Sequence, residues 1–396
     1  MITAHRLWNR RTRALLLMLP MVLFIGVFFV WPLTIMVKQS ISDTAVLHLL
    51  PRTAEAIADW DRASPPTPAM QAALIEDLRA ADDQQAIGDM VRRLNGAQSG
   101  FRTLMNKTLT AVANPAAGPL LAPIDRRWEQ PQFWTAIAEA LNPITDRYLL
   151  ASVDLERDSK GQIAEAAPGA SANRVIFIRT FWIAAVVTFF CMLIGYPYAL
   201  LIVASTGAVR AILLASVLLP LWTSLLVRTA AWFILLQEQG LINGFLMSTG
   251  VVSAPLALIF NRTGVVIAMT HVLLPLMVLP IYSVLLTIPP NLMPAATSLG
   301  AHPIRAFLNV LLPLSLRGVI SGSLLVFMTA VGYYITPALV GGAGDQMISA
   351  IIAFYSTQTA NWSMASALGI VLLAITLILY VIYAQLSGRT SASGRM

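Results

Sequence analysis

One arginine stands alone inside a long apolar segment of this chain. Arg228 lies near one end of the apolar residues 210–236. An ionisable side chain is costly to bury at membrane depth, so its position marks a candidate functional site. The alternative is that its side chain extends to the membrane interface and leaves only its stem among apolar groups. The residues alone leave both interpretations open.

Several aromatic residues in similar surroundings are candidates for lining a passage for a solute. They are Trp232, Tyr196, Tyr198, Tyr333 and Tyr334. Aromatic faces attract cations, and phenol oxygens accept hydrogen bonds from amines. Packing aromatics, or a belt at the membrane interface, would give the same pattern. His271 lies on an apolar helix, and we expect it to be packed or hydrogen-bonded and not to relay protons.

Other chemistries find no support in the residues. The only lysines are Lys38, Lys107 and Lys160, and none follows a G-x-x-x-x-G frame, so the chain has no phosphate-binding loop of that kind. Cys191 is the only cysteine, which excludes a disulfide within the chain. There is no metal-ligand cluster or nucleophile constellation. We therefore expect no enzymatic activity and no metal or cofactor in this chain.

The composition is that of a membrane protein. Hydrophobic residues make up 57% of the chain and charged residues only 11%, against about 25% charged residues in soluble domains. Six apolar segments are long enough to cross a bilayer. These predicted spans are residues 14–37, 179–204, 210–236, 263–286, 318–340 and 365–386. A shorter apolar stretch at 251–260 is expected to be re-entrant or interfacial.

The charges predict an orientation. A group of arginines falls on one side of the predicted spans with no acid among them. They are Arg6, Arg10, Arg11, Arg13, Arg210, Arg305, Arg317, Arg389 and Arg395. The positive-inside rule makes that side cytoplasmic, so both termini are expected inside. The net charge of +7 then reflects topology and not nucleic-acid binding.

Residues 38–174 differ from the rest of the chain. They hold 17 of its 19 acidic residues and would lie outside the membrane. Their pattern predicts helices, with Thr67 as an N-cap before Pro68 and a turn at 158–161. Three apolar faces are expected. They consist of Met70, Leu74 and Leu78; of Ile87, Met90, Val91 and Leu94; and of Phe133, Ile137 and Leu141. A spacer and a docking surface for a binding protein both remain open as roles.

Residues 294–313 form a short loop between two apolar segments. Pro294 and Pro303 can each occupy the first turn of a helix, where a missing N–H costs nothing. Gly300 is suited to end the first helix in a left-handed conformation. Arg305, among apolar neighbours, makes the second helix amphipathic. The physical pattern is that of a small docking element.

The register of this loop resembles the EAA loop of ATP-binding-cassette importer permeases, E-A-A-x3-G-x9-I-x-L-P. The matching residues are Ala295, Ala296, Gly300, Leu312 and Pro313. Val310 replaces the isoleucine, and Pro294 stands where the family has glutamate. In that family the loop is a coupling helix that binds a separate ATPase subunit. The resemblance therefore assigns Pro294, Arg305 and the matching residues to ATPase coupling.

Further motifs between about residues 175 and 386 look like the spermidine/putrescine branch of these permeases. They are residues 194–197, 220–222, 228–232, 240–243, 279–282 and 336–342. The sequence departs from that branch at Gly332-Tyr333-Tyr334, where an acid often follows the glycine, and in the length of the insert.

The resemblance implies an all-α, six-helix type I importer transmembrane domain in a bacterial inner membrane. The expected divisions are 1–13 as cytoplasmic N-terminus, 14–37 as the first span, 38–174 as a periplasmic insert, 175–386 as the permease core with a coupling loop at 287–317, and 387–396 as a cytoplasmic tail. The implied partners are an ATPase dimer that binds ATP and Mg²⁺, a second permease subunit and a periplasmic substrate-binding protein. The implied solute is a small amine, either polyamine-like or an amino-acid derivative. A secondary transporter, or a membrane-anchored sensor or scaffold, remains an alternative.

Overall fold

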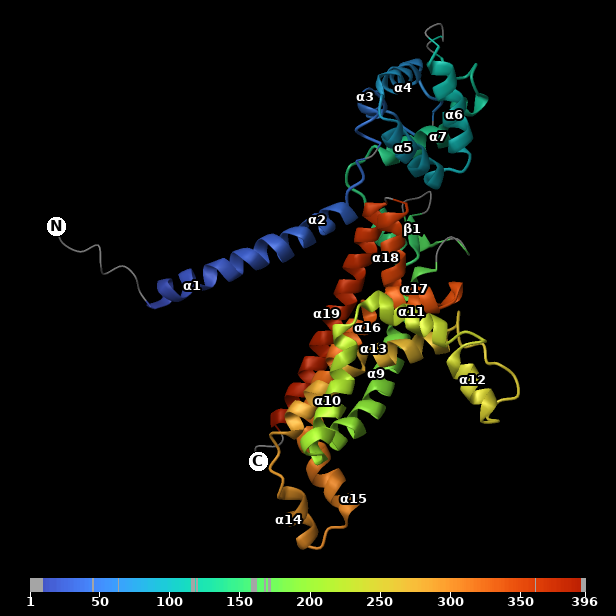
Figure 1. The fold of residues 1–396 in the computed structure, drawn as a ribbon. Helices are drawn as coiled ribbons and strands as arrows, with labels where there is room; N and C mark the ends of the chain where they lie inside the picture. Colours follow the sequence, from blue (N-terminus) through green and yellow to red (C-terminus); the bar gives the residue numbers. More distant parts are fainter. Residues whose placement is uncertain are drawn as a thin grey trace, which may run out of the picture. The chain divides into compact units, whose positions relative to one another are not determined.

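The computed structural model describes residues 10–44, 46–62, 64–114, 118, 120–157, 162–166, 169, 172–359 and 361–392. The chain forms two compact units, Met1–Leu150 and Ala151–Met396. Nearly all regular structure in the described residues is helical (Figure 1), which confirms the all-α prediction. The strands are the short antiparallel pair β1 (Leu155–Arg157) and β2 (Ile163–Glu165).

The first unit begins with a long apolar helix made of three segments. These are α1 (Arg10–Ile25), the π-helical η1 (Gly26–Val30) and α2 (Trp31–Ser40). Leu16–Ser40 is long and apolar enough to cross a membrane, as expected for the first span. The π-helical turn leads directly to Pro32, which has no N–H for an intrahelical bond.

The rest of the first unit is a set of short helices around an apolar core. These are α3 (Pro51–Ile57), α4 (Pro68–Ala80), α5 (Gln84–Ala97), α6 (Phe101–Val112), η2 (Arg126–Glu129), α7 (Pro131–Ala140) and the start of α8 (Arg147–Ser152), which runs across the boundary of the unit at Leu150. The core contains fully buried aromatic side chains: the ring centroids of Trp128 and Trp134 lie 5.5 Å apart, and those of Phe101 and Trp128 lie 6.1 Å apart.

The structure confirms the local predictions for this unit. Thr67 is the N-cap of α4 and accepts a bond from the backbone N–H of Met70 at 3.3 Å. The three predicted apolar faces, on α4, on α5 and on α7 with Leu141, are all buried in the core. The predicted turn at 158–161 lies outside the described residues, between β1 and β2.

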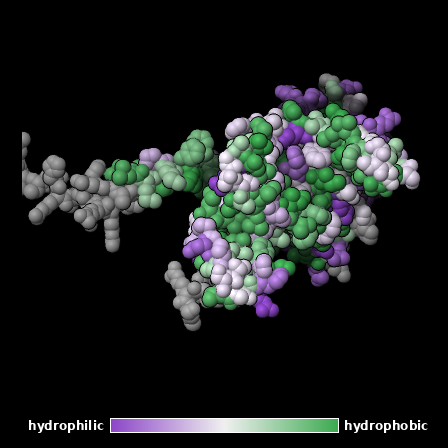
Figure 2. Space-filling view, turned by 60° about the horizontal axis from the view of Figure 1, so that its bottom comes forward, coloured by the Kyte–Doolittle hydropathy of each residue, from purple (hydrophilic) through white to green (hydrophobic). Residues whose placement is uncertain are grey.

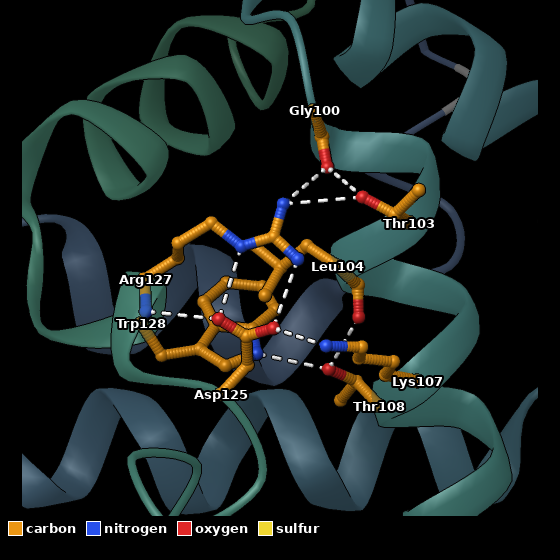
Figure 3. Close-up of polar contacts among 8 residues, drawn as sticks. All are labelled: Gly100, Thr103, Leu104, Lys107, Thr108, Asp125, Arg127 and Trp128. Atoms are coloured by element: carbon orange, nitrogen blue, oxygen red, sulfur yellow. Dashed lines mark hydrogen bonds and ion pairs between the residues drawn. The ribbon is translucent and has the colours of Figure 1, made fainter.

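An ion-pair network around Asp125 lies beside the buried Trp128 (Figure 3). The Asp125 carboxylate accepts bonds from Arg127 Nε at 3.0 Å, Arg127 Nη2 at 2.8 Å and Lys107 Nζ at 3.1 Å. Arg127 Nη1 also donates to the Gly100 carbonyl at 3.0 Å. The bonds from Arg127 hold the pKa of Asp125 well below its usual range. Since Asp125 and Lys107 come from different segments, the network ties η2 to α6.

The second unit contains the long apolar helices. Its helices are α9 (Asn173–Ala204), α10 (Gly207–Trp222), α11 (Leu225–Leu235), α12 (Leu241–Ser248), α13 (Arg262–Leu285), α14 (Leu292–Ser298), α15 (Pro303–Ala306), η3 (Phe307–Leu311), α16 (Leu312–Val331), α17 (Ile335–Val340), η4 (Ala343–Asp345), α18 (Ile348–Thr357) and α19 (Trp362–Ala392). Its centre is the mutual packing of α9, α13 and α16.

Two glycines one helical turn apart let α16 approach α13 closely. A Cβ added at Gly318 would lie 2.8 Å from Ile281 Cα, and one at Gly322 would lie 2.9 Å from Met277 Sδ and 3.0 Å from its carbonyl oxygen. Membrane helices associate through such small-residue contacts because lipid gives no hydrophobic drive to pair them.

Across both units, five helices of the described chain could each cross a membrane, or six if one bent pair counts as a single span. The bent pair is α10 and α11, which together make up the predicted span 210–236 and meet at an angle of 104°. Thr223 and Ser224 have extended backbone at the bend, three and four residues after Pro220, which removes one helical N–H in the last turn of α10. The apolar run 210–236 is therefore not one continuous helix, and the count of six spans holds if the bent pair is taken as one.

The predicted span 318–340 was also misplaced. The helix runs from Pro303 to Val331, and the chain leaves it at Gly332 before α17 begins. Pro337 lies in the first turn of α17, where no N–H is required, so it starts a new helix and does not continue the old one. The stretch 251–260 is non-helical and follows the short helix α12.

Large apolar side chains are exposed over much of the second unit. Leu193, Ile212 and Leu377, for example, are each more than half exposed. Hydrophobic residues cover much of the surface visible in Figure 2. Such exposure fits lipid as the solvent of these helices, as the composition predicts.

Candidate functional site

The segment that resembles a coupling element is a helical hairpin that projects beyond the ends of α9, α10 and α13 (Figure 1). Gly300 ends α14 with φ +90°. Its N–H donates to the Thr297 carbonyl at 3.0 Å, and the Ala301 N–H donates to the Ala296 carbonyl at 3.1 Å. These two bonds make a Schellman motif, which confirms the predicted left-handed end of the helix.

The tip of the hairpin exposes apolar side chains. Leu299 is 89% exposed, and Ile304 and Leu308 are at least half exposed. Of the residues assigned by the motif, Pro294, Ala295, Gly300, Arg305 and Pro313 are exposed and Ala296 and Leu312 are half-buried. Exposed apolar side chains grouped at the end of a projecting hairpin are a candidate contact surface for another protein.

The second helix of the hairpin differs from its prediction. Pro303 is the first residue of α15 and Pro294 is the third residue of α14, so both prolines lie in the first turn of a helix, as expected. However, α15 is not separate: it continues through the π-helical η3 into α16. As in the first span, the π-helical turn directly precedes a proline, here Pro313. The hairpin is therefore rigidly continuous with a core helix.

A polar cluster lies where α11, α13 and α17 meet. Trp232 Nε1 donates to His271 Nδ1 at 3.1 Å, and the two rings meet edge to face. Arg228, one turn from Trp232, lies close enough for its charge to act on both His271 and Tyr333. Its Nε is buried and has no hydrogen-bond partner among the described residues. Buried donors are normally paired, so this atom requires an explanation.

A buried hydrogen bond holds the cluster together. The hydroxyls of Thr229 on α11 and Thr336 on α17 lie 3.1 Å apart, and both side chains are fully buried. Tyr333 occupies the break between α16 and α17. The structure therefore brings three of the predicted path residues together, namely Arg228, Trp232 and Tyr333.

The remaining predicted path residues lie elsewhere. Tyr196 bonds to Ser315 at 2.8 Å and packs edge to face on Phe307, near the start of α16. Tyr198 bonds to Ser216 at 2.6 Å and so joins α9 to α10. Tyr334 is 45% exposed at the start of α17. The contacts of Tyr196 and Tyr198 favour packing, which was the alternative interpretation of these aromatics.

Sequence reasoning missed a second polar cluster, near the N-terminal ends of α9 and α13. Arg262 Nε donates to Asp345 Oδ1 at 3.2 Å, and its guanidinium lies 5.4 Å from the Trp182 ring centroid. Arg179 is close enough to interact with Asp345 as well, and its Nε is buried without a partner in the described chain. Asp345 is one of only two acids after residue 174, and that scarcity could have revealed it.

The polar groups of the two clusters can form hydrogen bonds and ion pairs. They offer guanidinium, imidazole, indole and hydroxyl groups on apolar helices. Among the residues described, no group of His, Cys, Asp and Glu is arranged to hold a metal ion.

Comparison with known proteins identifies the family. Residues 175–392 match the family described as "binding-protein-dependent transport system inner membrane component". The spermidine/putrescine transport system permease protein PotB of Escherichia coli (strain K12) is 31% identical over 208 residues, which are 52% of this chain and 76% of that protein. PotB of Haemophilus influenzae is 34% identical over 198 residues, which are 50% of this chain and 69% of that protein.

A solved structure of a bacterial alginate ABC transporter, in complex with an alginate pentasaccharide-bound periplasmic protein, gives a TM-score of 0.47. It is 16% identical and covers 55% of this chain and 80% of its own. The family match excludes the first 174 residues and contains the hairpin and both clusters. The chain therefore belongs to the inner membrane components of binding-protein-dependent transport systems, and it is a multi-pass permease subunit.

Proposed function

We propose that the hairpin at 292–313, within the loop 287–317, transmits ATP-driven movements from a separate ATPase subunit. The observation that carries this proposal is the Schellman turn at Gly300, which displays Leu299 at the tip of a projecting hairpin. The hairpin continues without a break into α16, so a push at the tip moves a helix that packs against α9 and α13. ATP and Mg²⁺ would be bound by the ATPase.

A cysteine cross-link tests this contact. With Leu299→Cys, a cysteine pair to the ATPase subunit should form in the assembled complex and should change in yield when ATP is bound. Val209→Cys, on an exposed residue at the start of α10, is the control and should not form it. Failure of Leu299→Cys to cross-link in a complex that hydrolyses ATP would contradict the coupling role.

The proposed topology has both termini in the cytoplasm and residues 45–170 outside. The arginine asymmetry of the sequence supports it, since this topology would put nine arginines and no acid in the cytoplasm, as the positive-inside rule requires. External labelling should modify Ser99→Cys and not Ser387→Cys. Labelling of both from outside would overturn the topology, including the cytoplasmic place of the hairpin.

The solute proposed for this chain is a small amine, either polyamine-like or an amino-acid derivative. The related PotB proteins support it because they are permeases of spermidine/putrescine systems. Trp232 and Tyr333 supply aromatic surface that attracts ammonium groups. The solute would be delivered by a periplasmic binding protein and would pass between this chain and a second permease subunit by alternating access.

Uptake into liposomes tests the amine proposal. The complete transporter is reconstituted with its binding protein, and putrescine, spermidine and zwitterionic amino acids are compared as substrates. Accumulation of at least one of them, dependent on ATP, is the expected result. Uptake confined to an anion without an amine would make the proposal wrong.

A further inference from the structure

The cluster of Arg228, Trp232 and His271 presents donors. The indole N–H can only donate, so the bond at 3.1 Å makes His271 Nδ1 the acceptor. The ring proton of His271 then lies on Nε2, and that N–H is the free polar group of the ring. A guanidinium has five N–H donors and no acceptor. Since the Nε of Arg228 is unpartnered in the described chain, the cluster has donor capacity to spare.

The positive charge of Arg228 also has no ion-pair partner among the described residues. From residue 175 to the end of the chain, the only acids are Glu238 and Asp345. Asp345 is engaged by Arg262, and Glu238 is exposed beyond the end of α11. An unpaired guanidinium at membrane depth costs several kcal/mol, roughly 3 on insertion scales, so a partner of opposite charge would be strongly favoured.

These two properties specify the chemistry of a ligand. A carboxylate accepts hydrogen bonds, carries one negative charge and matches the planar fork of a guanidinium. A second ammonium group would meet repulsion from Arg228 and would find no acceptor of full charge. The edges of the cluster are aromatic, since Trp232 and Tyr333 flank Arg228, and they can face the apolar or ammonium part of the same ligand.

We propose that Arg228 and His271 bind the carboxylate of the transported solute, which is therefore an amine that also bears a carboxylate. This rests on the proposed function and chooses the amino-acid derivative over the polyamine. Trp232 is a positioning residue: it holds the imidazole through Nδ1 and so directs Nε2–H to the ligand. The buried Thr229–Thr336 bond fixes α17, and with it Tyr333, beside the arginine.

The test compares matched solutes with the reconstituted transporter and its binding protein. 4-Aminobutanoate and putrescine have the same number of carbons and share one ammonium end, but only the first has a carboxylate. Lysine, spermidine and succinate complete the set. The wild type should accumulate a carboxylate-bearing amine. Arg228→Gln should lower its uptake roughly 10- to 100-fold, the range expected for hydrogen bonds to a charged group.

Variants separate binding from folding. Arg228→Lys keeps the charge but loses the fork, so we expect partial uptake with a raised KM and little change in kcat. Trp232→Phe should raise KM in the same direction by less. Arg174→Gln, which removes another arginine of the second unit, is the control and should leave uptake unchanged. Equal loss for every solute in Arg228→Gln, with kcat and not KM affected, would overturn the proposal.

The outcomes also distinguish this inference from the one on which it rests. Uptake confined to putrescine and spermidine would overturn the carboxylate site and leave the amine proposal standing. Uptake of succinate alone would overturn the amine proposal and support the carboxylate site. No ATP-dependent uptake of any of the solutes would overturn both.

Discussion

The helical part of the first unit and the helix bundle of the second differ in which side chains they bury. In residues 46–141 the large side chains are inside, with Trp128 and Trp134 fully buried. In the bundle, large side chains such as Trp222 are outside, and glycines such as Gly318 lie where helices meet. The first region is held by apolar burial in water, and the second by close packing in a solvent that is itself apolar.

The polar groups follow the same division. In the first unit, buried acids are paired: Asp125 with Arg127 and Lys107, and Asp43 with Arg93 and Tyr148, although Arg93 Nη1 is buried without a partner in the described residues. In the bundle, two arginines keep a buried Nε without a partner in the described chain. The first unit thus has its buried acids in ion pairs, whereas the bundle combines the Arg262–Asp345 pair with two arginines whose buried Nε has no partner in the described chain.

The largest expected effect comes from a buried tryptophan in the first unit. Trp128→Ala leaves a cavity and removes the bond from the indole N–H to the Thr108 hydroxyl, so it should destabilise that unit by about 3–5 kcal/mol. Hydrogen exchange of amides in 68–141 of the full-length protein measures it. Trp222→Ala, at an 80% exposed site, is the control and should change stability by less than about 0.5 kcal/mol. Similar losses of stability in Trp128→Ala and Trp222→Ala would contradict the contrast between the buried core of the first unit and the exposed side chains of the bundle.

The Asp125 network predicts a pH dependence. Bonds from Arg127 lower the pKa of Asp125 in the folded state, so its contribution is complete above the unfolded pKa, about 3.9, and is lost as pH falls further. Asp125→Asn should cost about 1.5–3 kcal/mol at pH 7 and progressively less in acid. The free energy of unfolding of the first unit, obtained from hydrogen exchange of its amides as a function of urea concentration at pH 7 and pH 3, measures this.

The matched control for that measurement is Asp82→Asn, an exposed acid just before α5. It should change stability little at either pH. A constant cost of Asp125→Asn from pH 7 to pH 3 would show that the charge of the carboxylate is not what stabilises the network.

Close packing in the bundle can be tested with one methyl group. Gly318→Ala puts a Cβ 2.8 Å from Ile281 Cα, so α16 and α13 must move apart at a cost of about 1–3 kcal/mol. Thermal unfolding in detergent, read by the rate of proteolysis, measures it. Gly244→Ala, where no atom lies within 4 Å, should have no such effect. Equal behaviour of the two variants would show that α16 can shift freely.

Local signals in the sequence predicted local structure well. The Thr67 cap, the buried faces of α4, α5 and α7, and the left-handed Gly300 each depend on residues a few positions apart. The errors lie where distant segments decide the outcome. The bend at Thr223 and the break at Gly332 interrupt apolar runs that hydropathy cannot divide, because both sides of each break are equally apolar.

The candidate sites show the same limit. Arg228 was selected as a candidate because an ionisable side chain is unusual at membrane depth, and Tyr333 because aromatic faces attract cations. The bond from Trp232 to His271 joins residues 39 apart, and the ion pair from Arg262 to Asp345 joins residues 83 apart. No spacing rule relates such residues, so only the packing of α11 on α13, and of the α17–α18 connection on α13, reveals them.

The smallest effect on stability, and a large one on transport, is expected at the hairpin tip. Gly300 has φ +90°, and no atom lies within 4 Å of the place a Cβ would take, so a side chain there meets no clash but strains the backbone. Gly300→Leu should cost about 1–2 kcal/mol, confined to the hairpin. Gly300→Asn, which tolerates the left-handed conformation, is the matched variant and should cost less.

The measurement of coupling for these two variants is ATPase activity of the complete complex with solute-loaded binding protein. Stimulation should be lost in Gly300→Leu and largely kept in Gly300→Asn, because the Schellman turn sets the position of Leu299. Wild-type stimulation in the leucine variant would mean that the hairpin is only a connection between two spans and does not carry movements of the ATPase to the bundle.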